Sequence, residues 1–278
     1  MRRPAAAAAF ALLAAASWGA TLEGRISETE LPTFRAPFDF APGAEGGVVV
    51  LEDLEGTVRL VPGGARVSTL AGVASPKLLA ADETGLLLVL DGTSGVAAFR
   101  KGRESWRMKL QGDIRPGRPV GMAARNGIIW IADRSPARVL LFAYDGKRLA
   151  VTDLRPWARS PFSVALGSSG EAFVTDPMGP AVVALTPAGS FSASLSLEGT
   201  GVTRPTGVAV DPSGKVWVSD GVTGVVSCLD PKGGIHTVHC GGKPPRFQDP
   251  LRLGWARGAL WVLEGKPGRV KRADWEEQ

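Results

Sequence analysis

The sequence predicts an all-β protein in which six copies of a four-stranded antiparallel unit form a ring, the architecture of a six-bladed β-propeller. Three observations support this prediction: prolines recur at near-constant spacing, an acid recurs at one place in each copy, and an N-terminal segment can complete the last copy. The composition agrees. Hydrophobic residues make up 44% of the 278 residues, and 36 Gly and 21 Pro separate short Val-rich runs, which favours strands over helices.

The repeat is clearest from Pro205 to Asp220, which reads PTGVAVDPSGKVWVSD. Prolines at positions 76, 119, 161, 205 and 250 lie 43, 42, 44 and 45 residues apart, and a degenerate first copy begins at Pro37. Each copy reads as a strand, a tight turn, a strand that ends in an acid, and two further strands. The first turn of the third copy is Asn126-Gly127, a strong signal for a β-hairpin.

Two residue types recur on the second strand of each copy. A bulky apolar residue lies three positions before each acid, and we interpret it as packing between neighbouring blades. The acids are interpreted as structural, because a carboxylate at a strand end accepts hydrogen bonds from the N–H groups of the following turn. The alternative is a ring of acids that holds Ca²⁺ or another divalent cation. The acids are Asp53, Asp91, Asp133, Asp176, Asp220 and Glu264, and the apolar residues are Val50, Leu88, Trp130, Phe173, Trp217 and Trp261.

The two ends of the chain together supply one blade. The last copy stops after its third strand, Gly268–Arg272, and a strand-like segment, residues 21–27, precedes the first copy. We expect this segment to add the fourth strand of the last blade and so to close the ring, which hides open sheet edges. Residues 21–278 then form a single domain with blades near 37–74, 75–117, 118–159, 160–203, 204–248 and 249–278.

Residues 1–20 have the pattern of a signal peptide. Met1-Arg2-Arg3-Pro4 is basic, residues 5–16 are apolar, and small residues follow at Ser17, Gly19 and Ala20. We therefore expect a secreted or periplasmic protein with no membrane span after signal removal, and a retained anchor is the alternative. Loss of the two arginines lowers the net charge from +5 to +3, which does not indicate nucleic-acid binding.

The loops that precede the prolines open on the same face as the acids, because strands alternate in direction within a blade. These loops are rich in Arg and aromatic residues, which are enriched at binding hot spots. Arg252 stands where two other copies have Gly121 and Gly207, which places a cation near the mouth of the channel. The residues predicted to bind a partner are Arg115, Arg118, Trp157, Arg159, Arg204, Arg246, Phe247 and Arg252.

Signals for catalysis are weak, and we expect no cofactor. His236 and His239 are three positions apart in one expected strand, Ile235–Cys240, so their side chains point to opposite faces and cannot readily share a metal. A hairpin turn at residues 230–234 would place Cys228 opposite His236 and offset it from Cys240 by ~13 Å. Whether the two cysteines form a disulfide stays open, since a slipped hairpin would bring them together.

The repeat resembles the unit of the NHL-repeat family, most closely from Pro205 to Asp220 and again around Asp133, where Arg138-Val139 follows. The resemblance implies a six-bladed propeller and names no activity. We expect an exported, non-catalytic scaffold that binds another envelope or extracellular protein, or a ligand, through its Arg-rich and aromatic loops. The alternative is a propeller lyase or lactonase with a metal site in the central channel, as in gluconolactonase-like and virginiamycin B lyase propellers.

Overall fold

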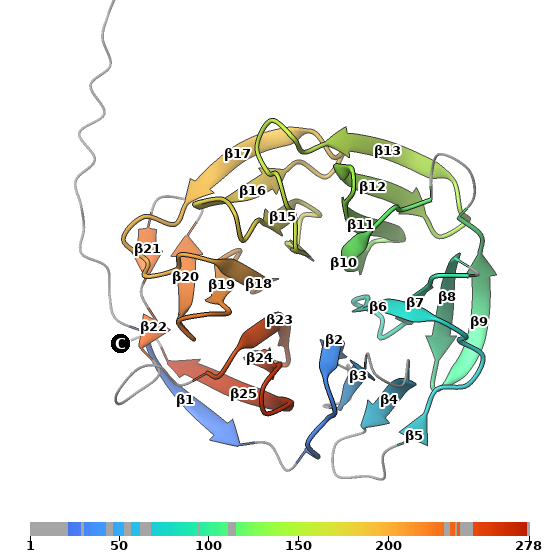
Figure 1. Ribbon diagram of the computed structural model, residues 1–278, viewed down its shortest axis with the longest axis horizontal. Coiled ribbons are helices and arrows are strands. Elements are labelled where there is room, and N and C mark those ends of the chain that lie inside the picture. Colours follow the sequence, from blue (N-terminus) through green and yellow to red (C-terminus); the bar gives the residue numbers. More distant parts are fainter. Residues whose placement is uncertain are drawn as a thin grey trace, which may run out of the picture.

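The computed structural model describes residues 22–28, 31–42, 47–52, 57–61, 68–93, 95–110, 115–230, 234–236, 238–239 and 247–276. Within these ranges every regular element is a β-strand, and the strands form six sheets. Figure 1 shows the sheets around a central axis, each running from the axis to the outer edge. The all-β prediction is confirmed. No helix in the described ranges is long and apolar enough to cross a membrane, and the expected signal peptide, residues 1–20, lies outside them.

We number the sheets in chain order. Sheet 1 contains β2 (Pro37–Pro42), β3 (Val48–Glu52), β4 (Thr57–Val61) and β5 (Ser68–Thr69). Sheet 2 contains β6 (Pro76–Ala81), β7 (Leu87–Asp91), β8 (Gly95–Arg100) and β9 (Arg103–Met108). Sheet 3 contains β10 (Pro119–Arg125), β11 (Ile128–Arg134), β12 (Ala137–Ala143) and β13 (Arg148–Asp153).

Sheet 4 contains β14 (Ser163–Leu166), β15 (Ala172–Thr175), β16 (Ala181–Leu185) and β17 (Phe191–Ser196). Sheet 5 contains β18 (Pro205–Val210), β19 (Val216–Asp220), β20 (Val226–Asp230) and β21 (Gly234–His236). Sheet 6 has the order β22 (Val238–His239), β1 (Leu22–Glu28), β25 (Arg269–Glu276), β24 (Ala259–Glu264) and β23 (Pro250–Ala256).

Sheet 6 combines strands from both ends of the chain. β1 pairs antiparallel with β25 over six residue pairs, from Glu23 opposite Glu276 to Glu28 opposite Lys271. β22 pairs in parallel with the other edge of β1, so the strand that we expected over residues 235–240 is divided between two sheets. Cys228 lies opposite His236, as the turn position predicts, whereas Cys240 lies outside the described residues.

The turns between inner strands follow the local sequence. Asn126 and Gly127 both have positive φ, 52° and 75°, and so do Arg257 and Gly258, 53° and 71°. Two successive residues of positive φ form the turn that matches the twist of a β-hairpin. Asn-Gly is well suited to these angles, because Asn tolerates positive φ and Gly has no Cβ.

The hydrophobic core is divided among the interfaces between consecutive sheets. Six clusters of buried residues occur in the described chain, and one of them joins sheet 6 to sheet 1 through Trp261, Val48 and Val50. Trp130 and Trp217, each 1% exposed, lie in two other clusters. These recurring side chains therefore pack sheet against sheet, which agrees with the interpretation from the sequence.

Six inner strands, β2, β6, β10, β14, β18 and β23, surround the axis (Figure 1). They approach one another closely. A Cβ on Gly207 would lie 2.8 Å from the backbone N of Leu253 and 2.9 Å from the carbonyl carbon of Arg252, so only glycine fits at this position. Each inner strand runs between two faces of the disc. We call the face with Pro37, Pro76, Pro119, Pro205 and Pro250 the proline face, and the opposite face, with the first turn of each sheet, the hairpin face.

Candidate functional site

The repeated acids are buried at the proline face and form hydrogen bonds within their own sheets and the loops that lead into them. Asp133 is fully buried, and its carboxylate accepts hydrogen bonds from the backbone N of Gly117 (3.0 Å) and Arg118 (2.7 Å). Arg138, the Arg that the NHL unit shares, donates from Nε to the same carboxylate at 3.0 Å. These contacts tie the loop before β10 to the end of β11.

The same geometry recurs in other sheets. Asp91 accepts from the backbone N of Ala74 and Ser75, and Asp176 accepts from Arg159 and Ser160. Asp220 accepts from four backbone N–H groups, those of Thr203, Arg204, Val222 and Thr223. Burial raises the pKa of Asp220, but these backbone hydrogen bonds lower it more, to about 2. The bonds that we expected from the following turn are present, for example from the backbone N of Thr93 to Asp91 and of Met178 to Asp176. The bonds from the loop before the proline are an addition that the sequence did not predict.

In sheet 1 the acid position belongs to a different residue from the one we expected. Glu52 pairs with Pro37, as Asp91 pairs with Pro76 and Asp220 with Pro205, and it accepts a hydrogen bond from the backbone N of Arg35. Asp53 lies outside the described residues. The degenerate first copy has adjacent acids, and the strand register, which the sequence left undetermined, selects Glu52.

The channel is closed near the proline face by a buried ion pair. Arg252, 4% exposed, donates from Nε to Oδ1 of Asp39 at 3.2 Å. Its other nitrogens donate to the carbonyl oxygens of Val120 (2.8 Å) and Phe162 (3.2 Å). Oδ2 of Asp39 accepts from the backbone N of Leu79 at 2.8 Å. The pair therefore links five of the sheets across the axis.

The burial of Arg252 corrects its predicted role. We expected this cation near the channel mouth as part of a partner surface, but its guanidinium lies inside the channel against the ring of Phe162, 4.4 Å from Cζ to the ring centroid. Burial lowers the pKa of Arg252, and Asp39 opposes that shift. Burial likewise raises the pKa of Asp39, and Arg252 opposes it. Each charge is thus stabilised by the other.

An arginine cluster lies beside this ion pair at the proline face. Arg134 is half-buried, donates from Nε to the carbonyl of Pro161 at 3.2 Å, and lies 5.5 Å from the ring of Phe162. Burial lowers the pKa of Arg134, the positive charges of Arg118 and Arg252 lower it further, and the negative charge of Asp176 opposes this shift. Arg118 is exposed. Like charges are therefore held close together here, a condition that favours an anion.

Of the other residues predicted to bind a partner, some are exposed at the proline face and others lie at the outer edge or in the core. Arg115, Arg159 and Arg204 are exposed, and Arg115 donates to the carbonyl of Gly92. Trp157, 40% exposed, stacks on Phe191 of β17 at 4.2 Å, at the outer edge of sheet 4 and away from the axis. Phe247 is 3% exposed and packs with apolar neighbours in the core between sheets 5 and 6, so it is not on the surface where we predicted partner binding. Arg246 lies outside the described residues.

Sequence reasoning missed Asp39, Arg134 and Phe162. Asp39 follows Pro37 by two positions, as Arg252 follows Pro250, so opposite charges at one repeat position were the available signal. Arg134 directly follows the repeat acid Asp133. In the described ranges no group of three or more His, Cys, Asp or Glu side chains could hold a metal ion.

The sequence matches no family model and no curated protein sequence. Among solved structures, the chain is similar to a protein of unknown function from Bacteroides thetaiotaomicron, with 16% identity, 90% of this chain and 72% of that chain covered, and a TM-score of 0.69. It is also similar to a gluconolactonase from Xanthomonas campestris, with 16% identity, 93% and 98% covered, and a TM-score of 0.67.

A third similar structure is a catalytically inactive virginiamycin B lyase from Staphylococcus aureus with quinupristin. It shares 17% identity, over 90% of this chain and 85% of that chain, with a TM-score of 0.66. At such identities the similarity concerns the fold and not the chemistry. Together with the sheets around one axis, it shows that this chain has a β-propeller fold.

Proposed function

We propose that this chain is an exported, six-bladed propeller of the NHL-repeat type that binds an acidic segment of an envelope or extracellular protein at its proline face. The repeat motif, the six sheets in the described ranges and the pairing of β1 with β25 support the architecture and its closure by the N-terminal strand. Residues 1–20 support export.

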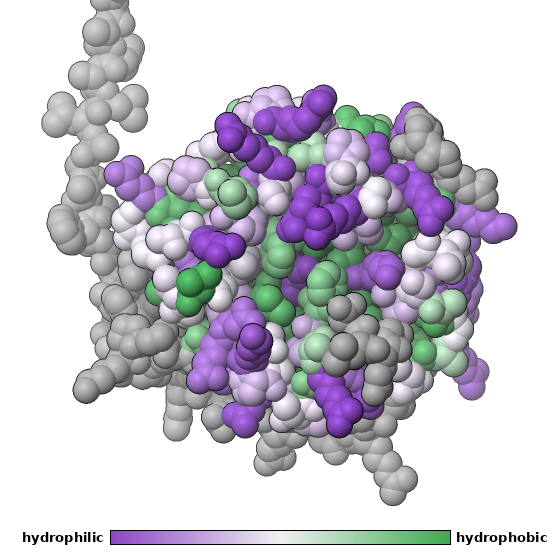
Figure 2. All heavy atoms as spheres, in the orientation of Figure 1, coloured by the Kyte–Doolittle hydropathy of each residue, from purple (hydrophilic) through white to green (hydrophobic). Residues whose placement is uncertain are grey.

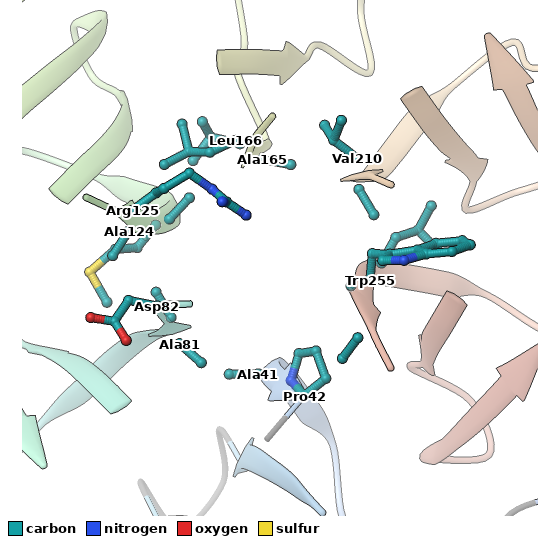
Figure 3. Close-up of a pocket in the computed structure, with 18 of the residues that line it drawn as sticks. Ala41, Pro42, Ala81, Asp82, Ala124, Arg125, Ala165, Leu166, Val210 and Trp255 are labelled. Atoms are coloured by element: carbon teal, nitrogen blue, oxygen red, sulfur yellow. The ribbon is translucent and has the colours of Figure 1, made fainter. Parts of the chain in front are cut away.

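The proposal rests on one observation: on the proline face the described acids are buried, whereas several arginines are exposed. The described repeat acids are buried and hydrogen-bonded to backbone N–H groups, so their charge is turned inward. Arg118, Arg159 and Arg204 are exposed on the same face. In Figure 2, which shows the side opposite to that of Figure 3, hydrophilic side chains surround the middle of the ring. Arginine forms bidentate hydrogen bonds with carboxylates, so an acidic partner is favoured.

The alternative, a propeller lyase or lactonase with a channel metal, receives less support from the geometry. A metal near the proline-face end of the channel would need free carboxylate ligands, but Asp39 is already paired with Arg252, and the described repeat acids accept hydrogen bonds from backbone N–H groups. Stoichiometric Ca²⁺ or Zn²⁺ in the purified protein, lost without unfolding when Asp133 or Asp220 is replaced, would favour the enzyme.

A labelled hexaglutamate peptide tests the proposal by fluorescence anisotropy at low and physiological salt. We expect binding that weakens with salt and falls at least about tenfold in the double variant Arg118→Gln/Arg134→Gln, since two charge-assisted contacts are removed. Lys101→Gln/Arg103→Gln, on and next to the outer strand β9, removes the same charge and should leave binding unchanged. Equal binding of hexalysine, or an unaffected Arg118/Arg134 variant, would contradict the proposal.

A further inference from the structure

The channel opens into a cavity of about 330 Å³ toward the hairpin face. Its walls come from the far ends of all six inner strands, among them Ala81, Ala124 and Ala165. Arg125 is the last residue of β10, about 20 Å along that strand from Pro119 on the proline face. The cavity and the arginine cluster therefore lie at opposite ends of the inner strands, so a ligand in the cavity would not depend on the proposed function.

Small side chains are the reason for the hollow. At the hairpin end of the inner strands the residues that face the axis are mostly alanine, with Pro42, Leu166 and Val210 beside them (Figure 3). The side chains of the walls are mostly apolar, and polar atoms contribute about as much of the exposed lining as apolar ones. The volume of the cavity is in the range of pockets that bind small molecules, which combine apolar side chains with a few placed polar groups.

Arg125 brings a positive charge into this pocket. Figure 3 shows its guanidinium extending into the space between the strands. Asp82 lines the same cavity, but its Oδ2 accepts from the hydroxyl of Tyr144 at 2.9 Å and its Oδ1 from the backbone N of Leu86 at 2.9 Å. Oε1 of Glu83, at the exposed rim, accepts from the backbone N of Asn126 at 3.0 Å. Among the residues that the structure describes, neither carboxylate forms an ion pair with Arg125.

Trp255 lies on the other side of the cavity (Figure 3). Its ring stacks on Trp217, with centroids 5.6 Å apart, which fixes the indole. Nε1 of Trp255 is buried and has no acceptor within the described part of the chain. Because this N–H is enclosed by the protein, Trp255 contributes its ring to the wall of the cavity and no hydrogen-bond donor to a ligand.

We propose that this cavity binds a small organic carboxylate with an apolar body. The carboxylate pairs with Arg125, whose guanidinium forms no ion pair with Asp82 or Glu83 in the described residues and can bind a planar anion through two parallel hydrogen bonds. The apolar body lies against the alanine, proline and valine side chains of the walls. The ligand thus enters from the face opposite the one that binds the protein partner.

Isothermal titration calorimetry of the mature chain with benzoate, benzamide and benzylammonium tests this ligand chemistry. Benzoate should bind with a Kd on the order of 1 mM, a value set by its few atoms. Benzamide, which has the same shape without the charge, and benzylammonium should bind at least about tenfold more weakly. Equal binding of benzoate and benzamide, or no benzoate binding at about 20 mM, would overturn the proposal.

Variants locate the site. Arg125→Gln should weaken benzoate binding at least about tenfold, and Arg125→Lys should retain part of it, since the charge remains without the bidentate geometry. Ala165→Leu should abolish binding by filling the cavity. Arg103→Gln on β9 is the matched control for charge and should not change binding. Thermal unfolding of each variant confirms folding, and a folded Arg125→Gln that binds benzoate as the wild type does would refute the assignment.

Discussion

Arg252 of sheet 6 and Asp39 of the neighbouring sheet 1 form a buried ion pair, with Nε and Oδ1 3.2 Å apart. The two residues are 213 positions apart in the chain and occupy equivalent places, two positions after Pro250 and Pro37. Four other copies have Leu78, Gly121, Ser163 and Gly207 there. The pair therefore joins the last sheet to the first and closes the proline-face end of the channel.

Replacing one partner of this pair should destabilise the protein strongly. Arg252→Met leaves Asp39 buried without a cation, and the free energy of unfolding should fall by about 3–5 kcal/mol. The double variant Arg252→Met/Asp39→Leu removes both charges and should recover a large part of that loss. Urea unfolding followed by tryptophan fluorescence measures all three proteins. If the double variant were less stable than the single one, the ion pair would not be the source of the effect.

The repeat acids should make stability depend on pH below neutrality. Because the pKa of Asp220 is lowered to about 2 in the folded state, its carboxylate stabilises the fold at neutral pH, and this contribution is lost as the pH falls from about 4 to about 2. Asp220→Asn should lower the free energy of unfolding at pH 7 by roughly 2 kcal/mol and flatten its dependence on pH in that window. Asp145→Asn, in an exposed turn, is the control and should change little. Equal pH slopes for wild type and Asp220→Asn would contradict this role.

Gly207 tests the close packing of the inner strands. A Cβ added at Gly207 meets the backbone of Leu253 and Arg252, which cannot move aside easily, so Gly207→Ala should cost about 2 kcal/mol of stability. Gly179→Ala meets only ordinary contacts, the nearest at 3.6 Å to Asp176, and should change stability by less than about 0.5 kcal/mol. Thermal unfolding of both variants gives the comparison. Equal midpoints would show that the strands can separate enough to admit a methyl group.

The N-terminal strand provides a test of ring closure. A chain that begins at residue 29 lacks β1, so the edge of β25 loses its six residue pairs and faces solvent. We expect this chain to unfold at least about 5 °C below a chain that begins at residue 21 and to aggregate more readily. Scanning calorimetry and light scattering measure the two effects. The same midpoint for both chains would mean that β1 does not close the ring.

Local sequence was sufficient to predict the repeating parts of this protein. The proline spacing, the turns such as Asn126-Gly127 and the buried Trp130 and Trp217 depend on residues close together in the chain, and period and turn chemistry report such contacts directly. For the first copy the sequence predicted Asp53 as the repeat acid, one residue after Glu52, which occupies that position in the structure. The repeat is degenerate there, and only strand pairing selects the register.

The tertiary structure decided what the centre of the ring contains. The repeat pattern predicts a surface cation at Arg252, yet the arrangement of the sheets around the axis places Asp39, Val120 and Phe162 around it and buries it. Nothing in the pattern indicates that Arg125 and Trp255 share a cavity. A repeat pattern describes each unit and its neighbours, whereas contacts across the axis join residues far apart in the chain and depend on how the units are arranged in space.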